Sequence, residues 1–477
     1  MSATTITAPT SSAAPDSAAL DRASTLHPFT RLSDYAHGIA ESTVVETASG
    51  VRITDDQGRT LIDGFAGLYC VNIGYGRTEV ADAISRQAHK LAFYHNFAGN
   101  TTDELARLSS RLVAMAPGKM SKVFYGLSGS DANETQAKLV WYYNNLLGRP
   151  RKKKIIARER GYHGCTVMSG SMTGLNFYHD HMDLPVMGIL RTGVPHYYWG
   201  AEPGETEEVF SLRRADELEA LILANDPDTV AAFIGEPVLG TGGIVPPPRG
   251  YWAAIQRVLR KYDILLIVDE VITGFGRIGT PFGCHMYDIE PDLITIAKGL
   301  TSAYLPMSGA IVSEKIYAAM EAGTASVGAF SHGYTYSGHP ISAAAANAVL
   351  DIVEREDLPL QAAETGAYLL DRLHQTFDDL PITAEVRGVG MMAAVEFVAD
   401  PATKRRFDPK LGVGARISKS ARDRGVIARA MPNGDILGFA PPLIMSRADV
   451  DEMVEVAGAA ARQVVDELVR ERSAALA

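Results

Sequence analysis

Short apolar runs alternate with helix-length segments through most of this 477-residue chain, from about Arg77 to Leu350. Helical patterns such as Ala215 to Ala224 and Trp252 to Lys261 separate the runs. The strand candidates are Lys122 to Tyr125, Lys154 to Ala157, Val230 to Ile234, Ile264 to Asp269, Leu293 to Ala297 and Met307 to Val312. Strands that alternate with helices pair mostly in parallel, and the helices then cover both faces of the sheet. The segment therefore predicts a large α/β domain.

The two ends of the chain have a different pattern. From Thr43 to Asp63, β-branched residues alternate with polar ones between Gly and Asp clusters, which is typical of a small antiparallel meander. After an alanine-rich helix from Ile341 to Arg355, helix and strand patterns continue to the C-terminus. Neither end has much core of its own, so we expect them to pack together as one smaller α+β domain. The expected parts are a flexible tail at 1–26, the first part of the small domain at 27–76, the large domain at 77–345 and the second part of the small domain at 346–477.

Charge and cysteine content exclude several classes of protein. With 45 basic and 56 acidic residues, the formal net charge is −11, so the chain lacks the positive field that attracts nucleic acid. The cysteines Cys70, Cys165 and Cys284 lie far apart without metal-binding or redox spacing, so we expect no metal site and a reducing, cytoplasmic setting. No run approaches the roughly 18 apolar residues needed to cross a bilayer, so we expect no membrane span.

Two side chains that can carry chemistry stand at predicted strand ends. Lys298 follows the apolar run Leu293 to Ala297, and Asp269 ends the run Ile264 to Asp269. Open α/β sheets bind ligands at this edge. A lysine there can form a Schiff base with a carbonyl cofactor, and an acid can keep a pyridine nitrogen protonated. Each residue alone could be a turn former or a solvated charge, but together they predict a pyridoxal phosphate (PLP) site.

A small-residue turn offers a place for the phosphate. The run Gly126-Leu127-Ser128-Gly129-Ser130-Asp131-Ala132-Asn133-Glu134 follows the strand Lys122 to Tyr125 and opens a helix. Backbone N–H groups and the positive end of the helix dipole would face an anion there, and Ser130 adds a hydroxyl. The alternative is an ordinary helix cap, because Ser and Asp are preferred capping residues. The turn alone leaves both interpretations open.

An aromatic residue could complete the site. Gly161-Tyr162-His163-Gly164 follows the strand Lys154 to Ala157, and the Tyr162 ring could lie over a planar cofactor. An isolated Tyr-His pair also occurs in cores and at pocket rims, and His163 could be a hydrogen-bonded turn residue. The PLP interpretation therefore depends on all these features together.

Several longer runs resemble the class III PLP-dependent aminotransferases, which have fold type I. They are Ser128-Gly129-Ser130, Tyr162-His163-Gly164, Glu236-Pro237, Val268 to Arg277, Ala297-Lys298-Gly299 and Gly333 to Pro340. The resemblance extends from about Pro28 to the C-terminus. The run Gly67 to Gly76 further resembles the (S)-selective amine and ω-amino acid:pyruvate transaminases.

The resemblance implies roles for particular residues. Lys298 would form the Schiff base, Asp269 would pair with the pyridine nitrogen, and Tyr162 and Val271 would lie on opposite faces of the ring. The implied cofactor-binding set is Ser128, Gly129, Ser130, Tyr162, His163, Glu236, Asp269, Val271, Lys298, Tyr334 and Thr335. Family members are homodimers with sites at the subunit interface, so Thr335 would reach the phosphate of the neighbouring subunit. A tetramer is left open.

The resemblance also implies a substrate pocket. Arg429 occupies the place of the family's mobile arginine, which binds a carboxylate and swings aside for uncharged groups; the alternative is a surface arginine beside a turn. Thr241 replaces the glutamate with which ornithine- and 4-aminobutyrate-type relatives hold that arginine, which argues against those specificities. Tyr69, Phe97, Tyr162 and Thr241 are expected to line the pocket, and Tyr69 stands where some amine transaminases have a tryptophan.

We therefore expect a ping-pong transaminase that moves an amino group from an amine or ω-amino acid to pyruvate or a related oxo acid. A PLP-dependent aminomutase or decarboxylase of the same fold is the main alternative. A non-catalytic binding protein of this fold is a second one, and it would tolerate loss of the Lys298 amine.

Overall fold

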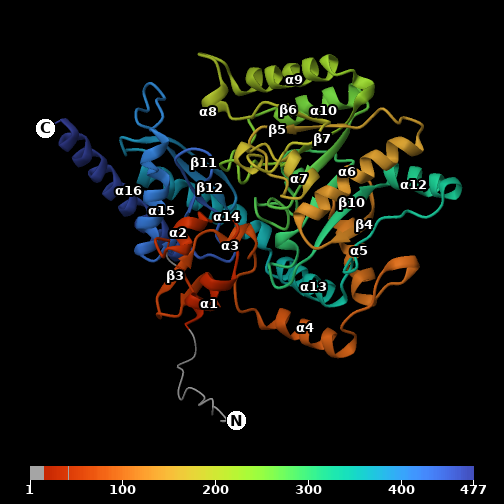
Figure 1. Cartoon of the computed structure of the whole chain (residues 1–477), viewed down its shortest axis with the longest axis horizontal. Coiled ribbons are helices and arrows are strands. Elements are labelled where there is room, and N and C mark those ends of the chain that lie inside the picture. The colour runs from red at the N-terminus through yellow and green to blue at the C-terminus, as the bar shows by residue number, and fades with distance from the viewer. Residues whose placement is uncertain (1–15, 41, 477) are drawn as a thin grey trace, which may run out of the picture.

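The computed structural model describes residues 16–40 and 42–476, and its larger part is built on a seven-stranded sheet (Figure 1). The strand order is β4-β10-β9-β8-β7-β5-β6. The strands are β4 (Met120–Gly126), β5 (Lys154–Arg158), β6 (Ile189–Thr192), β7 (Val230–Gly235), β8 (Leu265–Asp269), β9 (Leu293–Ile296) and β10 (Ser308–Ser313). β10 runs antiparallel to the other six strands, which all run in the same direction. The mostly parallel sheet is confirmed, and β6 is the strand that the apolar pattern did not reveal.

Alternate residues of the central strands point to opposite faces of this sheet. Leu266 and Val268 of β8 join one core cluster, whereas Leu265 and Ile267 join another. The first cluster is covered by α5 (Asp103–Met115), α9 (Glu207–Ala224) and α10 (Tyr251–Lys261), and the second by α6 (Gly129–Leu146) and α7 (Val167–Met172). Two-sided burial explains why these strands are apolar at nearly every position.

Both ends of the chain form the smaller part, at the left of Figure 1. One sheet has the order β1-β2-β3-β13 and the other β11-β12-β15-β14. The strands are β1 (Val45–Ser49), β2 (Arg52–Asp55), β3 (Thr60–Asp63), β11 (Thr383–Val389), β12 (Met392–Phe397), β13 (Val426–Ile427), β14 (Arg429–Ala430) and β15 (Ile436–Phe439). The long helices are α14 (Leu358–Phe377), α15 (Val413–Asp423) and α16 (Arg447–Leu476). Because β13 pairs in parallel with β3, the two ends share one sheet, as the sequence predicted.

The expected boundary between residues 345 and 346 falls inside α13 (Pro340–Arg355). Ala343 and Ala346 of this helix pack in the large-domain core, whereas Ala345 and Val349 pack in the small-domain core. The helix therefore belongs to both cores, and α4 (Thr78–Lys90) packs along it.

The N-terminal segment differs from the expected tail in its described part. Residues 1–15 lie outside the described residues, but α1 (Ser17–Ser24) follows an Asp16 cap that accepts a hydrogen bond from the Ala18 N–H. The Asp21 carboxylate accepts hydrogen bonds from the Tyr35 hydroxyl of α2 (Leu32–Ala36) and from His27 Nε2. These contacts give the helix partners that a polar, alanine-rich sequence did not indicate.

Shorter elements complete the chain. They are α3 (Ala66–Tyr69), α8 (Tyr197–Gly200), α11 (Gly283–Met286), α12 (Glu314–Val327) and the 3₁₀ turns Phe97–Gly99, Asn176–Tyr178, Pro227–Thr229, Lys298–Leu300 and Pro409–Leu411. Among the described residues, none of the helices combines the length and apolar character needed to span a bilayer.

Candidate active site

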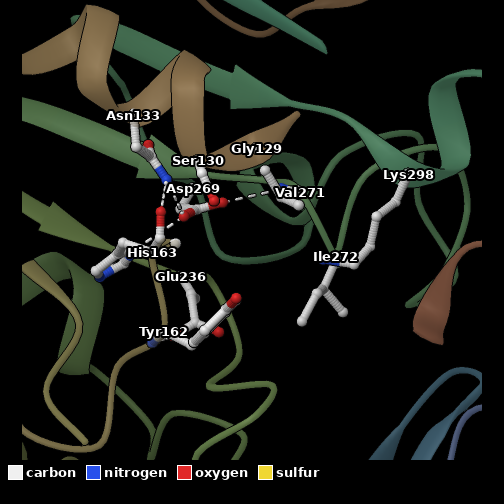
Figure 2. A pocket seen from close by; sticks show the side chains of 11 residues that line it. Gly129, Ser130, Asn133, Tyr162, His163, Glu236, Asp269, Val271, Ile272 and Lys298 are labelled. Carbon is white, nitrogen blue, oxygen red and sulfur yellow. Dashed lines mark hydrogen bonds and ion pairs between the residues drawn. The ribbon is translucent and has the colours of Figure 1, made fainter. Parts of the chain in front are cut away.

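The predicted lysine and aspartate lie at the same edge of the large sheet. Asp269 is the last residue of β8, and Lys298 begins the turn after β9, the parallel neighbour of β8. One pocket at this edge is lined by Gly129, Ser130, Asn133, Tyr162, His163, Gly164, Glu236, Asp269, Val271, Ile272 and Lys298. Figure 2 shows Lys298 entering from the side opposite Asp269 and His163. The structure thus brings together eight of the residues that the sequence proposed for the cofactor.

The Asp269 carboxylate is surrounded by donors. Its Oδ2 accepts hydrogen bonds of 2.8 Å from His163 Nδ1 and of 2.8 Å from Asn133 Nδ2, and its Oδ1 accepts one of 3.1 Å from the Val271 N–H. Asp269 is only 3% exposed. A carboxylate oxygen has two acceptor positions, so Oδ1 keeps one for a ligand. The arrangement suits a cationic N–H donor in the pocket.

Lys298 is available for chemistry. It is half-buried, and its Nζ makes no hydrogen bond or ion pair with any other described residue. Its backbone adopts a φ of 46°, in the left-handed region that non-glycine residues rarely occupy. Such conformations cluster at functional sites, where the surrounding structure enforces them.

The start of α6 combines a helix cap with an anion site. The Ser128 side chain accepts from the Asp131 N–H at 3.2 Å, and the Asp131 carboxylate accepts from the Ser128 N–H at 3.1 Å. Ser128 is exposed and does not line the pocket, whereas Gly129 and Ser130 do. The two interpretations of this turn therefore apply to different residues: Ser128 caps the helix, and the next two offer N–H groups and a hydroxyl to an anion.

Tyr162 is held from behind by Glu236. One Glu236 oxygen accepts from the Tyr162 N–H at 3.1 Å, and the other accepts from the Gly240 N–H at 2.7 Å. Burial raises the pKa of Glu236. The Tyr162 ring packs against Tyr178 with 5.3 Å between ring centroids. The same carboxyl group thus positions the aromatic wall of the pocket and the turn that carries Thr241.

The donor set of this pocket fits PLP. A helix start suits the phosphate, a buried carboxylate suits the ring nitrogen, a lysine amine suits the aldehyde, and Tyr162 offers an aromatic face. Gly164 supports the fit because a Cβ there would collide with the side-chain oxygens of Ser130 and Ser169. A larger residue at Gly164 would displace the Ser130 hydroxyl from the phosphate position.

Two of the expected substrate residues, Tyr69 and Arg429, lie beside this pocket. Tyr69 is 2% exposed, packs on Phe65 with 4.4 Å between centroids, and lies in one apolar cluster with Met431 and Ile272. Burial raises the pKa of Tyr69, and the charge of nearby Arg429 opposes that rise. The Arg429 guanidinium lies 5.4 Å above the Phe65 ring and pairs with no carboxylate among the described residues.

The loop that carries Thr241 is held by a cluster that the sequence did not reveal. Arg387 of β11 donates to the Gly243 and Ile244 carbonyls at 2.6 and 2.8 Å, and to the Glu385 and Glu396 carboxylates at 2.8 and 2.7 Å. His196 Nε2 lies 2.8 Å from Glu385, and the Trp199 Nε1–H donates to Glu396 at 2.7 Å. We call His196, Trp199, Glu385, Arg387 and Glu396 the domain clamp, because it joins the small domain to a loop of the large one.

Two groups of the domain clamp titrate abnormally. Burial lowers the pKa of His196, although its hydrogen bond to Glu385 acts in the opposite direction. Burial raises the pKa of Glu385, but the His196 hydrogen bond and the Arg387 charge outweigh that effect and leave the pKa lowered. The side chains of His196, Glu385 and Glu396 come close enough together to suggest a metal site. Arg387 already donates to both carboxylates, so the cluster is an ion-pair network.

The pocket lining does not include the predicted residues Phe97, Tyr334 and Thr335 of the same chain. Phe97 is 45% exposed and packs against Gly333. Thr335 is exposed, and the Tyr334 hydroxyl donates to the Asp131 carbonyl of α6 at 3.1 Å. The segment 333–335 therefore runs past the start of α6 and presents Thr335 outward.

Sequence reasoning missed Asn133, Gly164 and Ile272 as pocket residues. Asn133 lies one helical turn after Ser130 on α6, and that spacing could have placed it beside the sheet. Gly164 directly follows a residue of the predicted set. Ile272 gave no separate signal within an apolar run.

Comparison with known proteins gives consistent matches over nearly the whole chain. A family model for class-III aminotransferases matches residues 35–460. The uncharacterized aminotransferase y4uB of Sinorhizobium fredii is 70% identical, covering 94% of this chain and 97% of that protein. The diaminobutyrate–2-oxoglutarate transaminase of Halomonas elongata is 57% identical with the same coverage of 94% and 97%. The gamma aminobutyrate transaminase 1 of Solanum lycopersicum is 44% identical, covering 88% of this chain and 81% of that protein.

A solved structure matches over the same share of this chain as the first two of these relatives. The ω-transaminase of Pseudomonas jessenii in complex with PMP superimposes with a TM-score of 0.92 at 42% identity, covering 94% of this chain and 98% of that chain.

Proposed function

The chain belongs to the PLP-dependent class-III aminotransferases, and from this premise we propose that it transfers the amino group of an ω-amino acid or an amine to pyruvate or a related oxo acid. The observation that carries the proposal is Arg429, a guanidinium without a carboxylate partner among the described residues, beside aromatic side chains. A guanidinium fork binds a carboxylate in a bidentate manner. The aromatic surroundings suit an apolar substituent in the same place.

Each residue of the pocket has a part in this reaction. Bound PLP supplies the aldehyde that accepts the amino group and a ring that withdraws electrons. Lys298 Nζ, free of other partners among the described residues, holds the coenzyme and moves the proton at the substrate carbon in both halves of the reaction. In the pocket that these residues line, the Asp269 carboxylate would bind the ring nitrogen, Gly129 and Ser130 would bind the phosphate, and Tyr162 would keep water from one face of the ring.

The names of two relatives support an amino group at the far end of a carboxylate-bearing chain. Diaminobutyrate and gamma-aminobutyrate both have this form. The names of these relatives also add candidate substrates. The 44% identical relative is named for gamma-aminobutyrate, which is a candidate donor, and the 57% identical relative is named for 2-oxoglutarate, which is a candidate acceptor. We expect Thr241 to disfavour a 4-aminobutyrate donor, and the rates with a panel of donors test this expectation.

The test separates the two half-reactions by stopped-flow absorbance of the coenzyme. Donors are 4-aminobutyrate, 2,4-diaminobutyrate, a diamine and an aryl amine, and acceptors are pyruvate and 2-oxoglutarate. Arg429→Leu should weaken reaction with carboxylate donors and with both acceptors roughly 10- to 100-fold, because one charge-assisted contact is lost, and spare the aryl amine. Arg429→Lys is the control that retains the charge. Equal effects on charged and uncharged donors would refute the role of Arg429.

Product analysis tests the reaction class. One equivalent of alanine should appear for each pyruvate consumed. Carbon dioxide release, or an isomerised amine without any acceptor, would instead indicate the decarboxylase or aminomutase alternative.

We also propose a homodimer with sites at the interface, in a cytoplasmic setting. The exposed positions of Phe97 and Thr335 support the dimer, since neither contributes to the pocket of its own chain. Cys70, Cys165 and Cys284 are all free thiols, which agrees with a reducing compartment. Sedimentation of the coenzyme-loaded protein distinguishes monomer, dimer and tetramer.

A further inference from the structure

A polar row lies behind Asp269, inside an otherwise apolar layer. On the face of the sheet that α6 covers, β9 presents Leu293 and Thr295, and β8 presents Ile267 and Asp269. Strand register places Thr295 directly beside Asp269. Thr295 is the one polar residue of β9 and is fully buried. A buried hydroxyl in such a strand needs a partner.

That partner is Asn133 of α6. The Thr295 hydroxyl donates to Asn133 Oδ1 at 2.7 Å. The other end of the carboxamide, Nδ2, donates to Asp269 Oδ2 at 2.8 Å and to the His163 carbonyl at 2.8 Å. A carbonyl and a carboxylate can only accept, so the amide group of Asn133 must face them. The direction of this hydrogen bond toward Asp269 is therefore fixed.

Gln136, one turn further along α6, fixes the direction of the Thr295 hydroxyl. Gln136 Nε2 donates to the Ile294 carbonyl at 2.9 Å and to Thr295 Oγ1 at 3.3 Å. The Ile294 carbonyl would repel the carboxamide oxygen of Gln136, so the Nε2 end must face it. Because Thr295 Oγ1 thus receives a donor from Gln136, its own hydrogen points to Asn133. Gln136 and Asn133 are 0% and 1% exposed, so water does not compete.

We propose that Thr295 and Asn133 form a positioning relay that orients the Asp269 carboxylate and keeps its Oδ1 directed at the coenzyme ring. The hydrogen bonds from Thr295 to Asn133 and from Asn133 to Asp269 both point toward Asp269, so the relay favours a carboxylate over a carboxylic acid there. The relay also joins the three elements that build the pocket, because Asn133 lies three residues after Ser130 and Thr295 three residues before Lys298. Neither Thr295 nor Gln136 lines the pocket itself.

If Thr295 and Asn133 orient Asp269, removing their hydrogen bonds should change the protonation and the dissociation rate of the coenzyme. A role in packing alone would change neither. If Asp269 is less well oriented, the ring nitrogen loses part of its stabilising negative partner. The protonated coenzyme linkage at Lys298 then faces less positive charge from the ring, so the pH midpoint of its absorbance change should move upward. The coenzyme should also dissociate faster.

The test compares Thr295→Val, which removes the hydroxyl at equal size, with Thr295→Ser, which keeps it. For Thr295→Val we expect a midpoint shift of about half a pH unit or more, since each unit corresponds to a tenfold change in proton affinity. We also expect roughly tenfold faster loss of coenzyme, measured by trapping the released aldehyde. Thr295→Ser should stay within about twofold of the unchanged protein. Thermal unfolding of the coenzyme-free protein reports packing damage separately.

A second variant, Asn133→Asp, keeps the size and shape of the side chain but replaces its amide group with a carboxyl group. It places a second carboxyl group against Asp269, and two such groups cannot both be ionised without cost. Coenzyme loss at least as fast as in Thr295→Val is expected. The proposal is overturned if both variants lower only the unfolding temperature and leave the midpoint and the rate of coenzyme loss within about twofold of the unchanged protein. These measurements use bound coenzyme without any amine donor, so they are independent of the donor and acceptor proposed above.

Discussion

Removing the guanidinium of the domain clamp should destabilise the protein strongly. Arg387→Met keeps the apolar stem but deprives the Gly243 and Ile244 carbonyls and two carboxylates of their donor. The Glu396 side chain is 4% exposed and Glu385 is 25% exposed, so Glu396 bears most of the cost. Breaking a buried pair from one side costs about 3–5 kcal/mol. We expect the free energy of unfolding, measured by urea denaturation of the coenzyme-free protein, to fall by that amount. The KM should also rise, because the loop that carries Thr241 is no longer held in place.

A double-mutant cycle with Glu396→Gln isolates the interaction. The carboxamide introduced by this substitution would retain an oxygen for the Trp199 N–H, so the second change removes the buried charge and little else. The pair Arg387→Met and Glu396→Gln should recover about half or more of the loss, because no isolated charge then stays buried. Tryptophan fluorescence at a fixed protein concentration follows the transition, and Trp199 is one of the three tryptophans that contribute to the signal. A single-variant loss below about 1 kcal/mol, or strictly additive losses in the double variant, would refute this account of the clamp.

Three further predictions concern the pocket and its pH dependence. Lys298→Ala should retain bound coenzyme but lose turnover; undiminished amine-to-pyruvate transfer would reject its role. Gly164→Ala should bind PLP at least about tenfold more weakly, because the new methyl group collides with the Ser130 hydroxyl and with the Ser130 backbone at a residue whose φ is 133°; dialysis of the loaded protein measures this, and wild-type retention would contradict it. Burial lowers the pKa of His196, so the folded state binds fewer protons there than the unfolded state. The resulting stability is present above about pH 6.5, the usual value for histidine, and is lost as the pH falls through the lower pKa of the folded state. The free energy of unfolding should therefore decline less steeply below about pH 6.5 in His196→Gln, and parallel pH profiles would oppose this assignment.

The fold and the centre of the site were predictable because each had a strong local signal. Strands buried on both faces are apolar throughout, so β7, β8 and β9 were found close to their observed bounds. Lys298 and Asp269 stand out because they interrupt or end such runs. β6 is only partly buried, and its Arg191 breaks the apolar pattern.

The rest could not be predicted because it depends on contacts between distant segments. Asn133 and Thr295 are separated by most of the large domain, and nothing near either residue indicates the other. The domain clamp joins Arg387 to carbonyls of Gly243 and Ile244 in the same way. Glu385 and Arg387 do share one face of β11, but such alternation normally marks an exposed strand face.

The pairing of Ile62 with Val426 has a consequence for synthesis on the ribosome. The first three strands emerge long before the strand that covers the edge of β3, whereas the sheet from β4 to β10 can close earlier. Until β13 has been made, the nascent protein therefore exposes an unpaired β edge, which other unfinished chains could join. Chaperone demand in the cell should accordingly depend on how soon β13 is made rather than on the coenzyme-binding core.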